Sequence, residues 1–196
     1  MAHKDDIGAV VDDLDNLIAH KKYADMVQTE RRRITCTFIF NTKGDLLIQQ
    51  RSMNKKVLPG YWGPSVSGGV ESHETYMDNA IKEAGEELGL IDLDLTYVGN
   101  FAYDYPDHLE FAGLFKATYN GRSEDLVIQE SEVGAVRWIS IPGLLDWMKS
   151  DEHKVVSGMQ EQLNAVGIKT PPHETRYKKI LDNQGKIQCY HKVPSS

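Results

Sequence analysis

The sequence predicts an α/β fold in which a central sheet lies between layers of helices. Apolar and polar side chains alternate over residues 34–40 with the period of two that is typical of a strand. Residues 75–88 instead repeat apolar side chains at the spacing of a helix, and strand-like runs follow at about 95–104, 109–119 and 133–139. Strands mixed with helices in this way favour a sandwich with the sheet in the middle and the helices outside.

Length and composition indicate one globular domain. The 196 residues are enough for a full hydrophobic core, and 40% hydrophobic with 26% charged residues argue against disorder. The net charge of −7 repels phosphate backbones, so we expect no nucleic-acid partner. Cys36 and Cys189 form no zinc or disulfide motif, and neither an apolar leader nor a membrane-length apolar run is present. We therefore expect a cytoplasmic protein with no membrane partner.

Two hairpins are expected before the main helix. Apolar runs at 9–11 and 17–19 flank a polar turn. The alternating strand described above is followed by the turn residues Asn-Thr-Lys-Gly and a return strand at 46–50. Between the hairpins, residues 23–29 favour one or two helical turns. The glycine-rich segment 59–69 is interpreted as a loop that leads into the helix.

Local signals define the limits of that helix. Thr75 is a suitable N-cap, with Asp78 three residues later in the arrangement of a capping box, and Gly89 is placed to end the helix. We expect the helix to pack on the sheet through one apolar stripe. The stripe consists of Met77, Ala80, Ile81, Ala84 and Leu88.

The C-terminal part predicts two more helices and a further hairpin. The helices are expected at 141–148 and 155–165, and Pro171-Pro172 marks a boundary. We therefore expect one domain over residues 1–170, which includes the N-terminal hairpin, and an extension over 171–196 that is not a separate domain. The extension predicts strands at 177–181 and 186–191, and this hairpin is expected either to cover a sheet edge or to join two subunits.

Three glutamates point to chemistry on the main helix. Glu83, Glu86 and Glu87 share one helix face, where like charges repel by about 0.2–0.5 kcal/mol per pair. Gly85 costs about 1 kcal/mol more than alanine in a helix interior. A bare pattern of this kind is most often a solvated acidic face. A stretch that is so poorly optimised for stability also suits hard divalent cations, which prefer carboxylate oxygens.

The surrounding residues resemble the Nudix box. That motif consists of glycine, five residues, glutamate, seven residues, arginine-glutamate, an aliphatic residue, any residue, glutamate-glutamate, any residue, glycine and an aliphatic residue. The matching positions are Gly68, Glu74, Lys82, Glu83, Ala84, Gly85, Glu86, Glu87, Leu88, Gly89 and Leu90. The sequence departs at Lys82, where arginine is usual, and mildly at Ala84, where leucine is typical. The resemblance implies a Nudix-type α/β/α sandwich with a mixed central sheet.

The resemblance also implies roles for the box residues. Glu74 is implied as the partner that orients Lys82, although a lysine lacks the planar fork of arginine. The implied metal ligands are the carboxylates of Glu83, Glu86 and Glu87 and the backbone carbonyl of Gly68. Mg²⁺, with Mn²⁺ as the alternative, would offset phosphate charge and lower the pKa of water. We therefore expect a metal-dependent hydrolase that cleaves a nucleoside diphosphate or another diphosphate-linked small molecule by water attack on phosphorus.

The general base stays open among several glutamates. Glu86 and Glu87 lie inside the box, whereas Glu110, Glu130 and Glu132 lie outside it, and each of the outer three is more often a surface residue.

Two alternatives come from other classes of function. Residues 8–166 also resemble type I isopentenyl diphosphate isomerases and bacterial Nudix hydrolases of unassigned substrate. The isomerases use a cysteine in the loop before the box, where this chain reads Ser65-Val66-Ser67. Cys36 is expected in the core, and His73 and His108 are expected to be exposed rather than ligands. The other alternative is a diphosphate-binding module without catalysis, which is disfavoured because all four box glutamates are present.

Substrate recognition is expected outside the box. Arg51 could contact phosphate, and Trp62 and Glu110 are weaker candidates. Further aromatic candidates are Tyr61, Phe101, Tyr103 and Tyr105. The run 31–33, which consists of three arginines, is expected to be solvated. A homodimer is expected only from the habit of the family.

Overall fold

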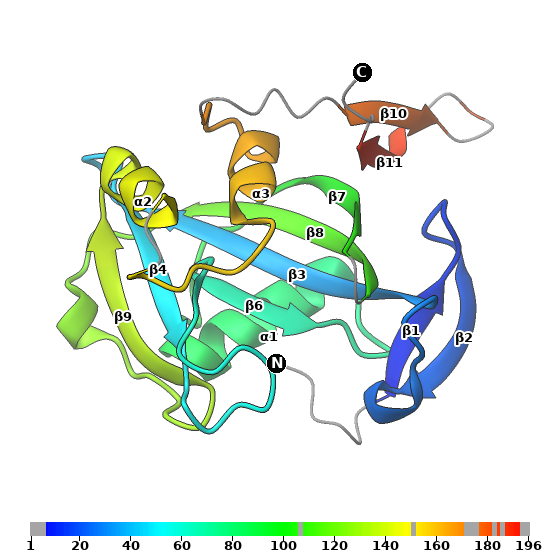
Figure 1. Ribbon diagram of the computed structural model, residues 1–196, viewed down its shortest axis with the longest axis horizontal. Coiled ribbons are helices and arrows are strands. Elements are labelled where there is room, and N and C mark those ends of the chain that lie inside the picture. The colour runs from blue at the N-terminus through cyan, green and yellow to red at the C-terminus, as the bar shows by residue number, and fades with distance from the viewer. Residues whose placement is uncertain are drawn as a thin grey trace.

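The computed structural model describes residues 7–105, 108–149, 152–170, 177–181, 184 and 187–192. The strands are β1 (Ile7–Val11), β2 (Leu17–Lys22), β3 (Arg31–Phe40), β4 (Leu46–Arg51), β5 (Trp62–Gly63), β6 (Val66–Gly69), β7 (Thr96–Asp104), β8 (Leu109–Thr118), β9 (Val133–Ile139), β10 (Tyr177–Leu181) and β11 (Ile187–Lys192). The helices are α1 (Tyr76–Leu88), α2 (Ile141–Met148) and α3 (Met159–Ala165), with short 3-10 turns at Tyr23–Asp25 and Ser123–Asp125. The described strands form one mixed sheet, shown in Figure 1.

The sheet divides beside its central strand. β3 runs parallel to β8 along its whole length, from the pair Arg31↔Leu109 to the pair Phe40↔Thr118. On its other side β3 pairs with β6 near its start, at Ile34↔Gly69, and with β4 near its end, at Ile39↔Leu47. The rest of β4 pairs with β5 and β9 and therefore diverges from β6. This divergence leaves a split in the sheet between β4 and β6.

Helices cover both faces of the sheet, as the fold class predicts. Neighbouring residues of β3 point to opposite faces. Phe38 packs in a cluster with Leu144 of α2 and Leu163 of α3. Ile39 packs in a second cluster with Leu88 of α1. In Figure 1, α1 runs beside β6 and away from α2 and α3. The expected α/β/α sandwich is confirmed.

Both ends of the described chain extend this sheet. The N-terminal hairpin of β1 and β2 joins it through β1, which pairs with the start of β3. The predicted C-terminal strands form an antiparallel pair, and β11 lies parallel to β7 at Tyr190↔Phe101 and His191↔Ala102. The hairpin therefore covers the edge of β7. Residues 171–176, at the expected domain boundary, lie outside the described residues.

Helix α1 buries a different stripe from the one expected. Met77 is 36% exposed and Ile81 is 48% exposed, so these two predictions are wrong. The buried residues of α1 are Asn79, Ala80, Glu83, Ala84, Glu87 and Leu88. The helix is rotated about its axis so that polar side chains, and not Met77 and Ile81, face β6.

Other boundaries differ for physical reasons. The glycine-rich segment 59–69 contains β5 and β6, because its small residues allow close pairing with β4 and β3. The helical turn expected at 23–29 is limited to Tyr23–Asp25. Helix α3 begins only at Met159, because Trp62 holds the preceding segment extended through backbone hydrogen bonds to Lys154 and Val156. Within the described residues, none of the helices has the length and apolar character needed to cross a membrane.

Candidate active site

The ends of α1 set which glutamates face the sheet. The Thr75 hydroxyl accepts from the backbone N–H of Asp78 at 3.1 Å, and the Asp78 carboxylate accepts from the backbone N–H of Thr75 at 3.0 Å. At the other end Gly89 adopts a left-handed conformation, with φ of 72°, and its N–H donates to Gly85. The capping box and the glycine end predicted for this helix are confirmed, and they fix its length and register.

Two of the three box glutamates on the helix point inward. Glu83 is 1% exposed and Glu87 is 3% exposed, whereas Glu86 is on the exposed side. One oxygen of Glu87 accepts from the Gln49 side chain at 3.0 Å and from the backbone N–H of Ser67 at 3.2 Å. Because Gln49 belongs to β4 and Ser67 to β6, Glu87 bridges the two strands at the split in the sheet.

The backbone of Gly68 lies against Glu83. A Cβ atom at position 68 would lie 2.1 Å from both Cδ and Oε1 of Glu83, which no real contact allows. Only glycine permits this approach, so the structure gives a physical reason for the first box position. It also brings the Gly68 backbone and the Glu83 carboxylate, two of the predicted metal ligands, to one place.

The inward carboxylates hold protons more tightly than usual. Burial raises the pKa of Glu83 above its ordinary value. Burial, with the charge of Glu83 in addition, raises the pKa of Glu87 to about 7, although the hydrogen bonds from Ser67 and Gln49 act in the opposite direction. A divalent cation would stabilise both carboxylates in the charged form. The atoms that could ligate a metal here, in the Glu83 and Glu87 carboxylates and the Gly68 carbonyl, are all oxygens. The residues therefore fit a hard ion such as Mg²⁺ or Mn²⁺.

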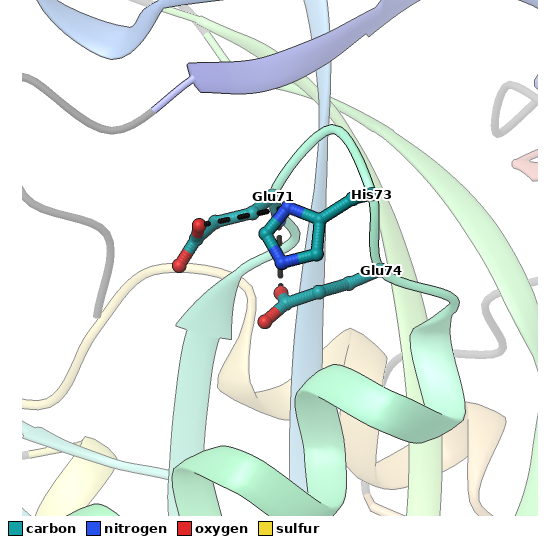
Figure 2. Close-up of side chains that lie close together, drawn as sticks. All are labelled: Glu71, His73 and Glu74. Carbon is teal, nitrogen blue, oxygen red and sulfur yellow. Dashed lines mark hydrogen bonds and ion pairs between the residues drawn. The ribbon is translucent and has the colours of Figure 1, made fainter.

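A second acidic group lies just before α1, and it differs in kind. Within the described residues, the one set of three or more acidic, histidine or cysteine side chains with ligand atoms inside 4.8 Å of one another is Glu71, His73 and Glu74. Figure 2 shows how these side chains converge. Lys82 forms ion pairs with both carboxylates, since its ammonium lies 2.7 Å from Glu71 and 2.6 Å from Glu74. We therefore interpret the group as an ion-pair cluster, with His73 exposed at its rim as the sequence predicts.

This cluster brings together the pair implied by the box. Burial would raise the pKa of Glu74, but the hydrogen bond from Lys82, with others from the backbone and Asn79, holds it below its ordinary value. The two carboxylates correspondingly raise the pKa of Lys82. Sequence reasoning did not identify Glu71 as the second partner of Lys82, nor Gln49 and Asn79 as partners of the buried glutamates. Only the short spacing between Glu71 and Glu74 offered a signal.

The candidate substrate residues are dispersed around the site. Arg51 follows Gln49 on β4 at alternate spacing, so both side chains point to the side of Glu87. Burial lowers the pKa of Arg51, and the charges of Glu87 and Glu132 partly offset this effect. Trp62 is partly buried, with its ring 5.6 Å from that of Trp147 in an edge contact.

The glutamates outside the box have three different environments. Glu110 is 4% exposed, so the surface position expected for it is wrong. It lies on β8 beside Arg32 and within 3.3 Å of the His108 ring, and these groups compensate its burial. Glu132 forms an ion pair with Lys55, and Glu130 is exposed.

The run of three arginines is not solvated as expected. Arg31 is 5% exposed and forms ion pairs with Asp13 at 3.1 Å and with Asp104 at 2.8 Å. Arg33 pairs with Asp15 at 2.7 Å. Arg31 and Arg33 are thus paired with carboxylates from distant segments, whereas the side chain of Arg32 is 37% exposed. The local sequence could not reveal these partners.

The aromatic candidates divide between core and surface. Phe101 and Tyr103 are 4% and 3% exposed and belong to the core cluster under α2 and α3. Tyr105 is partly buried and stacks on Tyr103 and on His108. Tyr61 is also partly buried, with the Lys154 ammonium 5.8 Å from its ring centre.

The cysteine and serine positions bear on the isomerase alternative. Cys36 is 2% exposed, as expected for a core residue, and burial raises the pKa of its thiol. Ser65 is fully buried and bonds to the backbone of Ile39 and Leu47. The Ser65 hydroxyl thus joins two strands of the sheet. The side chain of Cys189 lies outside the described residues.

Comparisons with known proteins agree with this fold. The NUDIX domain family matches residues 30–158 of the chain. An uncharacterized Nudix hydrolase of Pseudomonas aeruginosa is 36% identical over 107 residues, which cover 55% of this chain and 62% of the relative. An isopentenyl-diphosphate Delta-isomerase of Burkholderia multivorans is 34% identical over 119 residues, which cover 58% of this chain and 65% of the relative. The matches thus span less than two thirds of these two relatives.

Solved structures show the same fold at low sequence identity. A crystal structure of a Deinococcus radiodurans protein has a TM-score of 0.71 and 20% identity, and it covers 81% of this chain and 98% of its own. The NUDIX domain of Shewanella oneidensis NrtR, in complex with ADP ribose, has a TM-score of 0.55 and 13% identity over 74% of this chain and 90% of its own.

The α/β/α sandwich and the family match over residues 30–158 together identify a Nudix domain. This chain belongs to the Nudix family, as its resemblance to the box predicts.

Proposed function

We propose that the protein is a divalent-metal-dependent hydrolase of a small molecule that contains a diphosphate linkage. The observation that carries this proposal is the pair of buried carboxylates at the split in the sheet, with Glu83 held against Gly68 and Glu87 bound to Gln49 and to the backbone of Ser67. Two raised carboxyl pKa values in one place are typical of a functional site rather than of a helix face chosen for stability.

The metal ligands in this proposal are Glu83, Glu86 and Glu87, with the backbone carbonyl of Gly68. Bound Mg²⁺, or Mn²⁺, would supply charge to offset the diphosphate and would make water more acidic. Glu83 and Glu87 are already aimed inward, and Glu86 lies on the exposed side of the same helix segment, where substrate can approach.

Residues around the carboxylates suit the rest of the substrate. Arg51 lies on the side of Glu87, and its guanidinium can donate hydrogen bonds to a phosphate oxygen. Tyr61 and Trp62, in the segment between β4 and β6, offer aromatic surface for a base or another flat group. NrtR of similar fold was solved with ADP ribose, so nucleoside diphosphate derivatives are the first substrates to test.

Isomerisation is the second candidate, because one of the relatives is named as an isopentenyl-diphosphate isomerase. That chemistry needs an acid that protonates an alkene. The segment before the box, Ser65-Val66-Ser67, has no cysteine, and the thiol of Cys36 is buried in the core. Hydrolysis therefore agrees better with the residues present.

The decisive experiment is a substrate panel with Mg²⁺. It would contain nucleoside di- and triphosphates, nucleotide sugars, ADP-ribose, dinucleoside polyphosphates and isopentenyl diphosphate, with phosphate release and product mass read together. We expect Mg²⁺-dependent hydrolysis of one class, lost in Glu87→Gln. Conversion of isopentenyl diphosphate to its isomer without phosphate release would replace the proposal with the isomerase alternative.

A further inference from the structure

Asn79 is a fully buried amide in the part of the box that the motif leaves unspecified. It lies on α1 between Glu74 and Lys82, and its exposed fraction is 0%. A buried carboxamide needs partners for two donors and for its oxygen. The partners of Asn79 show what it connects.

Its nitrogen contacts three acceptors that belong to the site. Nδ2 lies 2.9 Å from the Gly69 carbonyl oxygen and 2.9 Å from Oε2 of Glu74. It also lies 3.4 Å from Oε1 of Glu83. Because an amide nitrogen carries two hydrogens, the two short contacts use both, and the contact to Glu83 shares one of them.

Its oxygen is held from the central strand. The Thr35 hydroxyl donates to Oδ1 of Asn79 at 2.6 Å. Thr35 is paired in register with Gly68, so the threonine, the glycines and the amide form one compact group. The Gly69 carbonyl and the Glu74 carboxylate can only accept, so they fix which end of the amide faces them, and the Thr35 hydroxyl then donates to the amide oxygen.

The contacts of Glu74 explain why this amide matters in this chain. Oε1 of Glu74 is bound by the Lys82 ammonium, and Oε2 is bound by Asn79 and by the backbone N–H of Glu71 at 3.0 Å. An arginine could bind both carboxylate oxygens through its fork, whereas a lysine is a point charge. Asn79 thus supplies a side-chain donor to the carboxylate oxygen opposite the one that Lys82 binds.

We propose that Asn79 is a positioning residue of the metal site, an inference that rests on the proposed function. It couples the Lys82–Glu74 ion pair to the Glu83 carboxylate and to the backbone that follows Gly68. The ligand atoms of Glu83 and Gly68 are thereby held in place before an ion arrives. Thr35 orients the amide and supports the same role.

The test measures Mn²⁺ binding directly, by titration calorimetry on the full chain, together with hydrolysis and melting temperature. Asn79→Leu keeps the size of the side chain and removes its donors. We expect it to weaken Mn²⁺ binding by about tenfold or more, because it releases two contacts to charged groups and one to the glycine backbone. Introducing Lys82→Arg into that variant is expected to recover part of the affinity, since the guanidinium can bind both oxygens of Glu74.

The matched control is Asn100→Leu. Asn100 on β7 is a second buried asparagine, 7% exposed. Its amide nitrogen donates to the Asp15 carboxylate, and its oxygen accepts from the Tyr97 hydroxyl. This control is expected to lower the melting temperature and to leave Mn²⁺ affinity within about twofold of the wild type. Loss of fold stability alone would therefore not imitate the expected result.

Separate outcomes distinguish this inference from the function on which it rests. Wild-type protein that binds no Mn²⁺, or binds it equally well as Glu87→Gln, would overturn both. Mn²⁺ binding that is weakened by Glu87→Gln but unchanged in folded Asn79→Leu would overturn the positioning role alone. If Asn79→Leu does not fold, Thr35→Val decides: weakening by about threefold supports the role, and unchanged affinity overturns it.

Discussion

Two glutamates at opposite ends of α1 lie in opposite electrostatic situations. Glu74 lies just before the helix, and its side chain is only 7% exposed, yet its pKa is lowered because Lys82 lies 2.6 Å away. Glu87 lies near the C-terminal end of the helix, where it is 3% exposed and its pKa is raised to about 7. Both carboxylates are largely withdrawn from solvent, so the identity of the neighbours decides the sign. Glu74 is compensated by a cation of this chain, whereas Glu87 is the carboxylate that the proposed function assigns to a metal ion.

The strongest test of this comparison is to remove the charge of Glu87. We expect Glu87→Gln to lower kcat/KM by about 100-fold or more, because a ligand charge is lost while the size of the side chain is kept. Glu124→Gln is the control, since Glu124 has a side chain that is 72% exposed on a remote 3-10 turn. Steady-state kinetics at saturating Mg²⁺ would measure both, and full activity in Glu87→Gln would refute the metal-site assignment.

The next effect is a pH dependence of stability in metal-free protein. The folded pKa of Glu87, about 7, exceeds the ordinary value of 4.5, so the associated stability is complete below about pH 4.5 and is lost as pH rises through 7. The raised pKa corresponds to a loss of at most about 3 kcal/mol in the free energy of unfolding between low and high pH. Urea unfolding with a chelator at pH 5 and pH 8 would measure it, and Glu87→Gln is expected to show a clearly smaller decline. Equal declines in the two proteins would contradict the raised pKa.

The approach of Gly68 to Glu83 can be tested by adding one methyl group. In Gly68→Ala the new Cβ would lie 2.1 Å from the Glu83 carboxylate, so that side chain has to move. We expect a loss of about 1–3 kcal/mol in stability, measured by chemical denaturation, together with weaker Mn²⁺ binding. Unchanged stability and affinity would show that the close contact has no functional role.

The smallest effect concerns the other glycine of the helix interior. A Cβ at Gly85 would meet its nearest neighbour, Ile91, at 3.5 Å, which is an ordinary contact. Gly85→Ala is therefore expected to stabilise the protein by about 0.5–1 kcal/mol through its higher helix propensity. A thermal melt would measure this. A destabilised variant would show that the second half of α1 needs a flexible backbone at position 85.

Local signals were enough to predict the scaffold of the site. Thr75, Asp78 and Gly89 act on their own backbone neighbourhood, so the limits of α1 could be predicted from sequence. The Glu74–Lys82 contact was predicted only from the resemblance to the box. The strands of both hairpins were predicted from their period and turn residues.

Long-range compensation is what the sequence did not reveal. Met77 and Ile81 resemble core residues until Asn79, Glu83 and Glu87 take the inward side of α1. The burial of Arg31 depends on Asp104, more than 70 positions away in the chain. In both cases residues of other elements decide the outcome, Thr35 and Gln49 as partners of the inward side of α1 and Asp104 as a partner of Arg31, and no local pattern reveals them.

The C-terminal hairpin has a consequence for solubility and for shortened forms of the chain. An open strand edge offers unsatisfied amide groups that can template aggregation. The β7 strand spans Thr96–Asp104, and β11 takes up part of its free edge. The outermost strand is then β10, which has only five residues, and a short edge strand offers little backbone for a further strand to pair with. A protein truncated after residue 170 would expose more of β7 as an unpaired edge strand, and self-association at high concentration is the expected result.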